Sequence, residues 1–313
     1  MKILVFGLGA LGTVYSCLLK EQGHKVSGLD RETVLDAIRE KGVRVNGIWG
    51  EHSETLDELF SEVNELADKD YDLLILTVKS YETEEVARQI ARVISPNTYV
   101  LLAQNGYGNF EAAAKSISET RLILGRVIFG AETTELGNSK VTVIADDVVL
   151  GSPANKVDAE LLETYAGIFN EAGIPTRTST EVMKYVWGKI IYNSALNPLG
   201  AILEVPYGKL AANENTRALM DSIIQEIFAV LSAHSQETLW PDCRAYRQAF
   251  YGQMVPTTAQ HHSSMLQDIQ RGRKTEIDAL NGAVVKLGKR YGVSTPVNEV
   301  IISLLRSKEE MRD

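Results

Sequence analysis

The chain has 313 residues, of which 44% are hydrophobic and 23% charged, and its formal net charge is -9. Length and composition predict two globular domains with sizeable cores, and the acidic balance argues against a nucleic-acid-binding protein. Two cysteines, Cys17 and Cys243, form neither a disulfide framework nor a metal-binding spacing, so we expect a reducing, cytoplasmic setting and no metal. Beyond the first helix no apolar run reaches about 18 residues, so we expect no membrane span.

The chain begins with a short apolar strand that leads into three glycines. Residues 3–6 form an apolar run typical of a buried parallel strand, and a helical pattern covers residues 14–19. Between them Gly7, Gly9 and Gly12 have the spacing G-x-G-x-x-G, in which the glycines allow a tight turn, the approach of a pyrophosphate and close helix packing. A glycine-rich turn without a ligand and a signal peptide are the alternatives, and the missing A-x-A cleavage site argues against the second. The predicted cofactor-binding loop consists of Gly7, Leu8, Gly9, Ala10, Leu11 and Gly12.

The second strand, predicted at residues 24–29, ends at Asp30 and Arg31. This is the distance from the glycines at which a dinucleotide fold places its ribose-binding residue. An acid there binds the 2′- and 3′-hydroxyls of NAD and repels the 2′-phosphate of NADP, whereas an arginine can grip that phosphate with two hydrogen bonds. The two neighbouring residues therefore favour different cofactors.

Strands and helices alternate up to about residue 179. Lys79 and the segment 104–108 follow predicted strand ends, where ligands gather in open α/β sheets. The stretches 122–132 and 140–150 look extended and partly antiparallel, so we expect a hairpin at the far edge of the sheet. The other expected helices are at 32–41, 83–94 and 161–172, with a partly helical segment at 56–67. Strands are expected at 71–78 and 99–103, residues 173–177 lead to a last short strand, and a hairpin strand at 43–49 turns at Asn46–Gly47.

From residue 180 onward the pattern is helical. Helices are predicted at 181–203, 215–233, 266–271, 276–291 and 299–306, with Asn213 as a cap and Gly292 ending the fourth. The sequence thus predicts a dinucleotide-binding domain over residues 1–179, a helical substrate-binding domain over 180–313, and a cleft between them.

One helix of the second domain carries a polar stripe. Lys189, Asn193 and Asn197 are spaced i, i+4 and i+8, so they share one side of an otherwise apolar helix. Buried polar groups need partners, but a solvated face would give the same spacing. Glu276 begins a predicted helix, and a favourable interaction of its carboxylate with the helix dipole would by itself explain an acid at this position. The serine pair at 263–264 could be a helix N-cap.

Taken together, these segments resemble the ketopantoate reductase (2-dehydropantoate 2-reductase) family over essentially the whole chain. The resemblance implies an α/β Rossmann-type N-terminal domain and an all-α C-terminal domain like that of 6-phosphogluconate dehydrogenase. It also implies NADPH-dependent reduction of 2-dehydropantoate to (R)-pantoate, a step of pantothenate and coenzyme A biosynthesis. It rests on GLGALG (7–12), TVKSYE (77–82), QNGYG (104–108), GKIIYNSALNPLGA (188–201) and SSMLQDIQRGRKTEIDALNG (263–282).

Carried over by motif, Lys189 resembles the general acid and Glu276 the acid that orients the substrate hydroxyl. Arg31 resembles the phosphate contact, so we expect NADP as the cofactor, with NAD as an alternative because of Asp30. The remaining positions resemble substrate-binding residues (Asn105, Asn193, Asn197 and Ser264) and cofactor-side residues (Lys79, Asn105 and Glu276).

Two residues depart from the family pattern. Tyr207 stands where the family commonly has the asparagine of an Asn-Gly pair. His261 stands where the family commonly has an asparagine three residues before the second serine, Ser264. These departures leave open a related reductase of another 2-oxo or β-hydroxy acid. A catalytically silent nucleotide-binding redox sensor is a third hypothesis, against which the presence of both Lys189 and Glu276 argues. The expected partner is a small 2-oxo acid, and a homodimer is also considered.

Overall fold

The computed structural model describes residues 1–67 and 69–311, and the chain divides into two compact units. The first unit comprises Met1–Gln104 and Asn109–Val182. The second comprises Asn105–Gly108 and the chain from Met183 onward, so a short loop from the first half belongs to the helical unit. Residues 312–313 of the predicted second domain lie outside the described residues.

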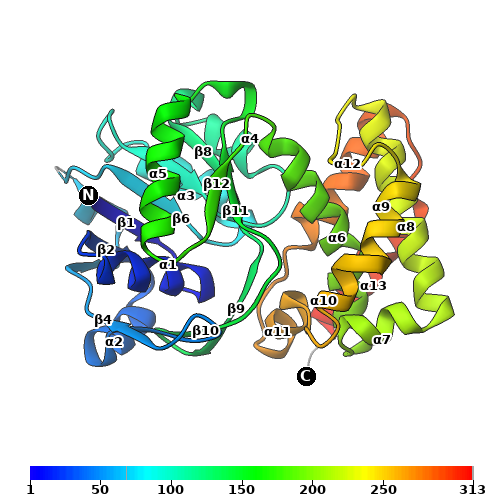
Figure 1. Cartoon of the computed structure of the whole chain (residues 1–313), viewed down its shortest axis with the longest axis horizontal. Coiled ribbons are helices and arrows are strands. Elements are labelled where there is room, and N and C mark those ends of the chain that lie inside the picture. Colours follow the sequence, from blue (N-terminus) through cyan, green and yellow to red (C-terminus); the bar gives the residue numbers. More distant parts are fainter. Residues whose placement is uncertain (68, 312–313) are drawn as a thin grey trace. The chain divides into compact units, whose positions relative to one another are not determined.

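The main sheet of the first unit has the strand order β12-β11-β8-β7-β6-β1-β2-β5 (Figure 1). Neighbouring strands pair in parallel, except that β11 runs antiparallel to β8. The chain leaves β1 toward β2 on one side and returns to β6 on the other, and ligands bind beside such a switch point. The strands are β1 (Lys2–Phe6), β2 (Lys25–Leu29), β5 (Glu58–Phe60), β6 (Leu73–Leu76), β7 (Tyr99–Leu102), β8 (Leu122–Arg126), β11 (Val148–Gly151) and β12 (Thr176–Thr178).

A second sheet has the order β4-β3-β10-β9, with strands His52–Glu54, Val43–Gly47, Asn138–Ile144 and Phe129–Glu135. The antiparallel pairing predicted for segments 122–132 and 140–150 is confirmed, since β8 pairs antiparallel with β11 near the edge of the main sheet. The hairpin of β9 and β10, however, lies in this second sheet, with β10 parallel to β3. Its apolar side covers α1 (Ala10–Glu21), where the rings of Tyr15 and Phe129 lie 6.2 Å apart. The predicted hairpin strand is confirmed, since β3 pairs antiparallel with β4. Its turn runs from Gly47 to Gly50, where Gly50 N–H donates to Gly47 O, so Asn46–Gly47 is the end of the strand rather than the middle of the turn.

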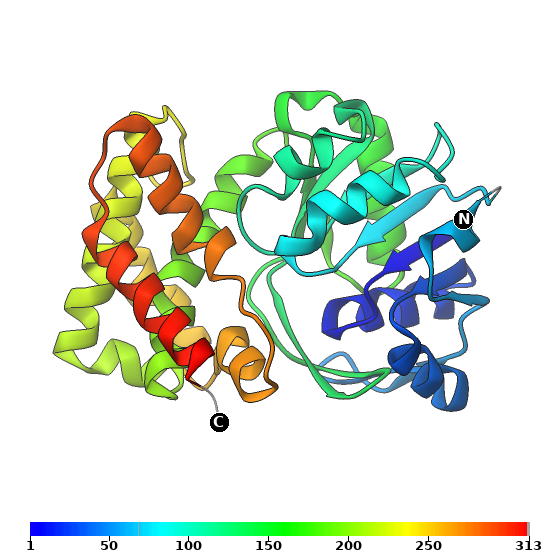
Figure 2. The same ribbon diagram turned by 180° about the vertical axis from the view of Figure 1, so that it is seen from behind.

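Helices cover both faces of the main sheet. Figure 1 shows α5 on the near face, and Figure 2 shows α3 on the opposite face. The rings of Tyr15 and Phe169 lie 5.5 Å apart, which puts α1 on the same side as α5. The predicted helix at 32–41 is confirmed, while segment 56–67 holds β5 and a 3-10 turn at Val63–Leu66. The other helices of this unit are α2 (Glu32–Lys41), α3 (Thr83–Ile90), α4 (Asn109–Ala114) and α5 (Ala159–Glu171).

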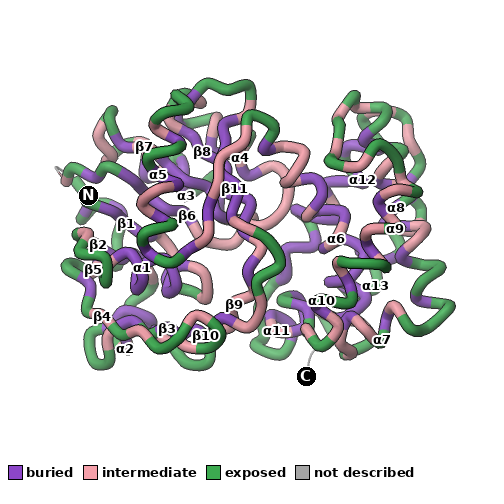
Figure 3. The backbone as a smooth tube through the Cα atoms, in the orientation of Figure 1, coloured by how far each residue is buried: buried purple, intermediate pink, exposed green. Residues whose placement is uncertain are grey.

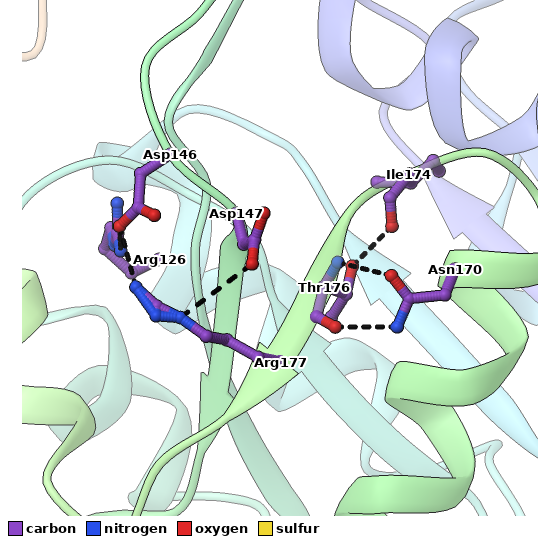
Figure 4. A network of polar contacts seen from close by, with 7 residues as sticks. All are labelled: Arg126, Asp146, Asp147, Asn170, Ile174, Thr176 and Arg177. Carbon is purple, nitrogen blue, oxygen red and sulfur yellow. Dashed lines mark hydrogen bonds and ion pairs between the residues drawn. The ribbon is translucent and has the colours of Figure 1, made fainter.

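Polar side chains fix the outer strand β12 to its neighbours (Figure 4). Asp146 Oδ2 accepts hydrogen bonds from Arg126 of β8 at 2.7 Å and from Arg177 of β12 at 2.8 Å. The side chain of Asn170 satisfies both backbone groups of Thr176, as a neighbouring strand would. Its Oδ1 accepts from Thr176 N–H at 2.8 Å, and its Nδ2 donates to Thr176 O at 2.7 Å. These contacts let a strand of three residues close the sheet.

The second unit is built around α6 (Val182–Leu203), whose residues from Ile190 to Ala201 are almost all buried (Figure 3). A helix that is apolar nearly all round belongs in a core. The predicted cap is confirmed, because Asn213 Oδ1 accepts from Asn215 N–H at 3.0 Å. The surrounding helices are α7 (Tyr207–Ala212), α8 (Glu214–Ala233), α9 (Cys243–Ala249), α10 (Val255–Thr257), α11 (Ser264–Gln270), α12 (Asn281–Tyr291) and α13 (Pro296–Glu310), with a π-helical turn at Phe250–Met254.

The predicted helix at 276–291 is wrong at its beginning. Residues Ile277–Ala279 form a 3-10 turn, Leu280 leaves the helical region with φ −108° and ψ −101°, and α12 starts at Asn281. The reason is that the Ala279 carbonyl accepts from Tyr107 N–H at 2.8 Å, which takes the acceptor that a continuous helix would use. Within residues 1–67 and 69–311, no helix is long and apolar enough to cross a membrane.

Candidate active site

The glycine loop of the first unit has the geometry of a phosphate cradle. Gly7 follows β1 with φ +95°, and a Cβ on Gly12 would lie 1.8 Å from Gly7 O, so helix α1 could not approach with a larger residue there. A Cβ on Gly9 would meet nothing within 4 Å, which leaves open space over the N-terminus of α1. No acidic residue stands in the first turn of α1, so its N–H groups and dipole favour an anion.

Asp30 is held by the loop itself. Its Oδ2 accepts from Leu8 N–H at 2.6 Å, and its Oδ1 accepts from Arg31 N–H at 2.7 Å. The Arg31 side chain is 77% exposed, and its Nε lies 3.7 Å from Asp30 Oδ1. The carboxylate thus ties the glycine loop to the end of β2, while the guanidinium remains accessible from solvent.

These residues fit a dinucleotide. The open space at Gly9 and the N–H groups of α1 suit a pyrophosphate, and Asp30 and Arg31 stand where a ribose is read. Lys79 follows β6, the strand next to β1, and precedes the 3-10 turn Ser80–Glu82. No group of three or more His, Cys, Asp or Glu side chains in the described part of the chain could hold a metal ion.

In the second unit, the stripe on α6 is not a solvated face. Asn193 is 9% exposed and Asn197 5% exposed, and Lys189 is half-buried. Lys189 Nζ donates a hydrogen bond to Asn105 Oδ1 at 2.6 Å. The structure therefore brings together a cation and an amide that are far apart in the sequence, beside two buried asparagines.

The loop Asn105–Gly108 also reaches the segment that carries Glu276. Tyr107 N–H donates to Ala279 O, and the Tyr107 ring packs on Trp187 of α6 with centroids 5.0 Å apart. Glu276 itself is 7% exposed and precedes the 3-10 turn. Helix α12 starts only at Asn281, so Glu276 does not lie in its first turn. The position of this carboxylate is therefore not explained by the dipole of α12.

The two residues that depart from the family pattern lie against each other. The Tyr207 and His261 rings meet edge to face, with centroids 5.3 Å apart. The Tyr207 hydroxyl donates to Asn197 Oδ1 at 2.5 Å. Burial raises the pKa of Tyr207 well above its ordinary value, so the hydroxyl stays protonated and remains a donor. Both residues stand out in the sequence, but no local pattern connects either of them to Asn197.

The serine pair divides into two roles. Ser263 is buried and caps α11, because its Oγ accepts from Leu266 N–H at 3.0 Å, as the capping interpretation predicted. Ser263 also packs on α6, where a Cβ on Gly200 would lie 3.5 Å from its own. Ser264 follows as the exposed first residue of α11.

The predicted site residues thus fall into two groups, each within one unit. One group is the glycine loop with Asp30, Arg31 and Lys79. The other belongs to the helical unit: Asn105, Lys189, Asn193, Asn197, Ser264 and Glu276. From the sequence, Asn105 was expected at a strand end of the nucleotide domain, and no local pattern signals its bond to Lys189.

Known proteins are similar to this chain over its whole length. It is 46% identical over 309 residues to the 2-dehydropantoate 2-reductase of Aquifex aeolicus, covering 99% of this chain and 97% of that protein. It is 31% identical over 315 residues to the 2-dehydropantoate 2-reductase of Pyrococcus abyssi, covering 99% of both.

Solved structures are also similar to this chain over its whole length. A ternary complex of D-mandelate dehydrogenase with NADH and anilino(oxo)acetate matches with TM-score 0.89 and 27% identity, covering 99% of both chains. The ketopantoate reductase of Ralstonia eutropha JMP134 matches with TM-score 0.86 and 29% identity, also over 99% of both. The model of the Ketopantoate reductase PanE/ApbA family matches residues 3–155, and that of its C terminal matches residues 181–309. The Rossmann-type N-terminal domain and the helical C-terminal domain are those of this family, and the chain belongs to the ketopantoate reductases.

Proposed function

We propose that this protein reduces 2-dehydropantoate to (R)-pantoate with a nicotinamide cofactor, NADPH being preferred. The proposal follows from family membership and from one observation, the bond between Lys189 Nζ and Asn105 Oδ1 among buried asparagines. An ammonium held in this way presents a proton donor at a defined point of a largely apolar helix.

The chemistry requires such a group. When the carbonyl carbon of a 2-oxo acid accepts a hydride, negative charge develops on its oxygen, and that oxygen ends as a hydroxyl. The bound nicotinamide supplies the hydride. Lys189 stabilises the charge and donates the proton from Nζ, while Asn105 Oδ1 keeps Nζ oriented. The carboxylate of Glu276 favours the charged form of the lysine and accepts a hydrogen bond from the new hydroxyl.

The amide side chains bind the substrate in this proposal. Asn193 and Asn197 lie on the same side of α6 as Lys189, and amide N–H groups can hold a carboxylate without adding charge. Because Asn197 Oδ1 already accepts from Tyr207, its Nδ2 is the part that remains to donate. Ser264 adds a hydroxyl from the exposed start of α11.

Residues 1–179 hold the cofactor and residues 180–313 the substrate. The glycine loop Gly7–Gly12 cradles the pyrophosphate, and Lys79 and Asn105 serve the cofactor side, together with Glu276. The exposed guanidinium of Arg31 supports NADPH, since it can reach a 2′-phosphate. The bond from Leu8 N–H to Asp30 Oδ2 supports the same choice, because it takes part of the acceptor capacity that a ribose hydroxyl would use.

The test uses purified protein and the absorbance of the reduced cofactor. NADPH and NADH are each supplied with 2-dehydropantoate and with a panel of other 2-oxo acids. Turnover confined to 2-dehydropantoate supports the proposal. Cofactor binding without any turnover would favour the redox sensor and end the assignment. Light scattering of the same sample reports whether the protein is a homodimer.

A related reductase of another 2-oxo acid is the second candidate. The observation that favours it is the contact of Tyr207 with Asn197 and His261, which puts two aromatic rings beside a predicted substrate residue. The D-mandelate dehydrogenase among the similar structures was solved with an aromatic 2-oxo compound. Faster turnover of an aromatic or bulkier acid than of 2-dehydropantoate would favour this candidate.

A further inference from the structure

Helix α6 contains a proline at a position that matters for the site. Pro198 lies inside the helix, directly after Asn197. Proline has no backbone N–H, so the carbonyl four residues earlier loses its helical hydrogen bond. That carbonyl belongs to Ser194, which directly follows Asn193. The gap in the helical ladder therefore spans the stretch between the two predicted substrate asparagines.

A side chain from another helix supplies the missing donor. Asn281 Nδ2 donates to Ser194 O at 3.1 Å. The same nitrogen donates to Asn298 Oδ1 at 2.9 Å, so both of its hydrogens are used. Asn281 and Asn298 are fully buried. Asn281 is the first residue of α12 and follows the 3-10 turn that starts after Glu276.

The chain of hydrogen bonds continues to a third and a fourth helix. Asn298 of α13 donates from Nδ2 to Glu226 Oε2 of α8 at 2.7 Å. Glu226 also accepts from the N–H groups of Val297 and Asn298, at 2.9 and 3.0 Å, and so caps α13. Because a carboxylate accepts and does not donate, Asn298 must turn Nδ2 toward Glu226 and Oδ1 toward Asn281. This order leaves Asn281 as the donor to Ser194.

These hydrogen bonds fix the orientation of the helices relative to each other and add little to the net stability of the unit. Neither Asn281 Oδ1 nor Ser194 Oγ has a hydrogen-bond partner within the described part of the chain, although both atoms are buried. Buried polar atoms without partners are unfavourable, and an aliphatic contact of the same size would avoid them. What an aliphatic contact could not do is fix the rotation and register of α6 against α12.

We propose that Asn281 is a positioning residue of the reductase site: it replaces the hydrogen bond that Pro198 removes from α6 and thereby holds Asn193 and Asn197 in register with the segment that carries Glu276. The inference rests on the proposed function for its catalytic consequence. Its structural part is that Asn281 Nδ2 donates to Ser194 O in place of the N–H that residue 198 lacks. This part depends only on the observed hydrogen bonds.

A double-mutant cycle between Asn281→Ala and Pro198→Ala tests the proposal. Asn281→Ala leaves Ser194 O without a donor, and we expect kcat/KM to fall by roughly tenfold to a hundredfold, as displacements of about 1 Å do. Pro198→Ala returns an N–H to α6 and offers Ser194 O its ordinary helical partner. In that background, Asn281→Ala should lower kcat/KM by roughly threefold or less, a coupling of the size that residues sharing a hydrogen bond show.

The matched control is Asn213→Ala. It removes a helix cap in the same unit, at α8, without touching α6. It should lower the melting temperature and leave kcat and KM unchanged, which separates a loss of stability from a loss of position. Asn281→Asp should be worse than Asn281→Ala, since it sets an acceptor against Ser194 O and Asn298 Oδ1.

Two results would overturn the proposal. One is a folded Asn281→Ala variant with wild-type kcat and KM. The other is an equal loss in both backgrounds, which would mean that Asn281 does not act through Ser194 O. If Asn281→Ala does not fold alone, the double variant is expected to fold, and its failure would count against the proposal. If the wild type turns over none of the acids, the proposed function fails. The same double-mutant cycle measured by thermal unfolding then still decides whether Asn281 replaces the hydrogen bond that Pro198 removes at Ser194 O.

Discussion

The hydroxyl of Tyr207 donates a hydrogen bond to Asn197 Oδ1, and the N–H of Tyr207 donates to the carbonyl of His261 at 3.1 Å. Two departures from the family pattern are thus parts of one contact, and that contact ends on a residue proposed to bind substrate. Asn197 is buried, so the orientation of its amide depends on the phenol. Because the pKa of Tyr207 is raised, the hydroxyl is a donor throughout the neutral and mildly alkaline range.

Tyr207→Phe should raise KM for the preferred acid roughly fivefold and leave kcat nearly unchanged. The change removes the donor that orients Asn197, and a hydrogen bond of this kind contributes about 1 kcal/mol. Steady-state kinetics over the panel of 2-oxo acids measure the effect. Tyr192→Phe is the matched control, since it removes a tyrosine hydroxyl from the same helical unit that bonds Thr258 and no predicted substrate residue. Equal KM values for wild type and Tyr207→Phe on every acid would exclude this bond from the substrate site.

Local patterns predicted most of the fold. The apolar run of β1, the glycine spacing and the confirmed helix α2 each depend on neighbours in the sequence. The stripe of Lys189, Asn193 and Asn197 was predictable for the same reason, since it lies on one helix. The predictions that needed only one element were therefore the most accurate.

The errors came from contacts between distant residues. The antiparallel pairing of segments 122–132 and 140–150 was right for β8 and β11, but the hairpin of β9 and β10 lies in a second sheet, because its apolar side packs on α1. The helix expected from Glu276 starts late because Tyr107, from the other half of the chain, takes the Ala279 carbonyl. The bond from Asn281 to Ser194 joins residues separated by 87 positions, although Pro198 inside a predicted helix did signal a carbonyl in need of a donor.

Lys189→Ala should lower kcat by roughly two to four powers of ten, the usual effect of losing a positioned acid. The fold should survive, because the half-buried Nζ bonds a loop amide rather than packing in the core. Single-turnover kinetics measure the loss of rate, and circular dichroism shows whether the fold is kept. Lys184→Ala is the control, as this lysine lies on the same helix and pairs with Glu237 at 2.8 Å. A folded Lys189→Ala protein with unchanged kcat would remove Lys189 from the mechanism.

Glu276→Ala should raise KM for the acid and lower kcat together, while cofactor affinity changes little. The carboxylate is assigned both to the substrate hydroxyl and to the charge of Lys189, so its loss affects binding and turnover. Asp278→Ala is the control, because this carboxylate lies in the same segment and pairs with the exposed Arg306. If Glu276→Ala lost only about 0.3–1 kcal/mol of stability, the carboxylate would have a helix-terminus role after all.

The cofactor prediction concerns Asp30 and Arg31. Arg31→Ala should raise KM for NADPH roughly tenfold or more and leave KM for NADH nearly unchanged, since a charge-assisted bond to phosphate contributes about 1.5–3 kcal/mol. Helix α2 should not suffer, because the Arg31 side chain makes no capping hydrogen bond. Arg39→Ala, which removes an exposed arginine from the same helix, is the control.

Asp30 needs a gentler change than alanine, because its Oδ2 holds Leu8 N–H at 2.6 Å and alanine would also release the glycine loop. Asp30→Asn keeps an acceptor for that N–H and removes the charge that opposes a 2′-phosphate. It should therefore raise the ratio of kcat/KM for NADPH to that for NADH, whereas Asp30→Ala should weaken both cofactors as well as shift the ratio. Initial rates with each cofactor at fixed acid concentration give the ratios. A wild type that prefers NADH, together with an Arg31→Ala variant that changes neither constant, would identify Asp30 as the residue that reads the ribose and reverse the cofactor assignment.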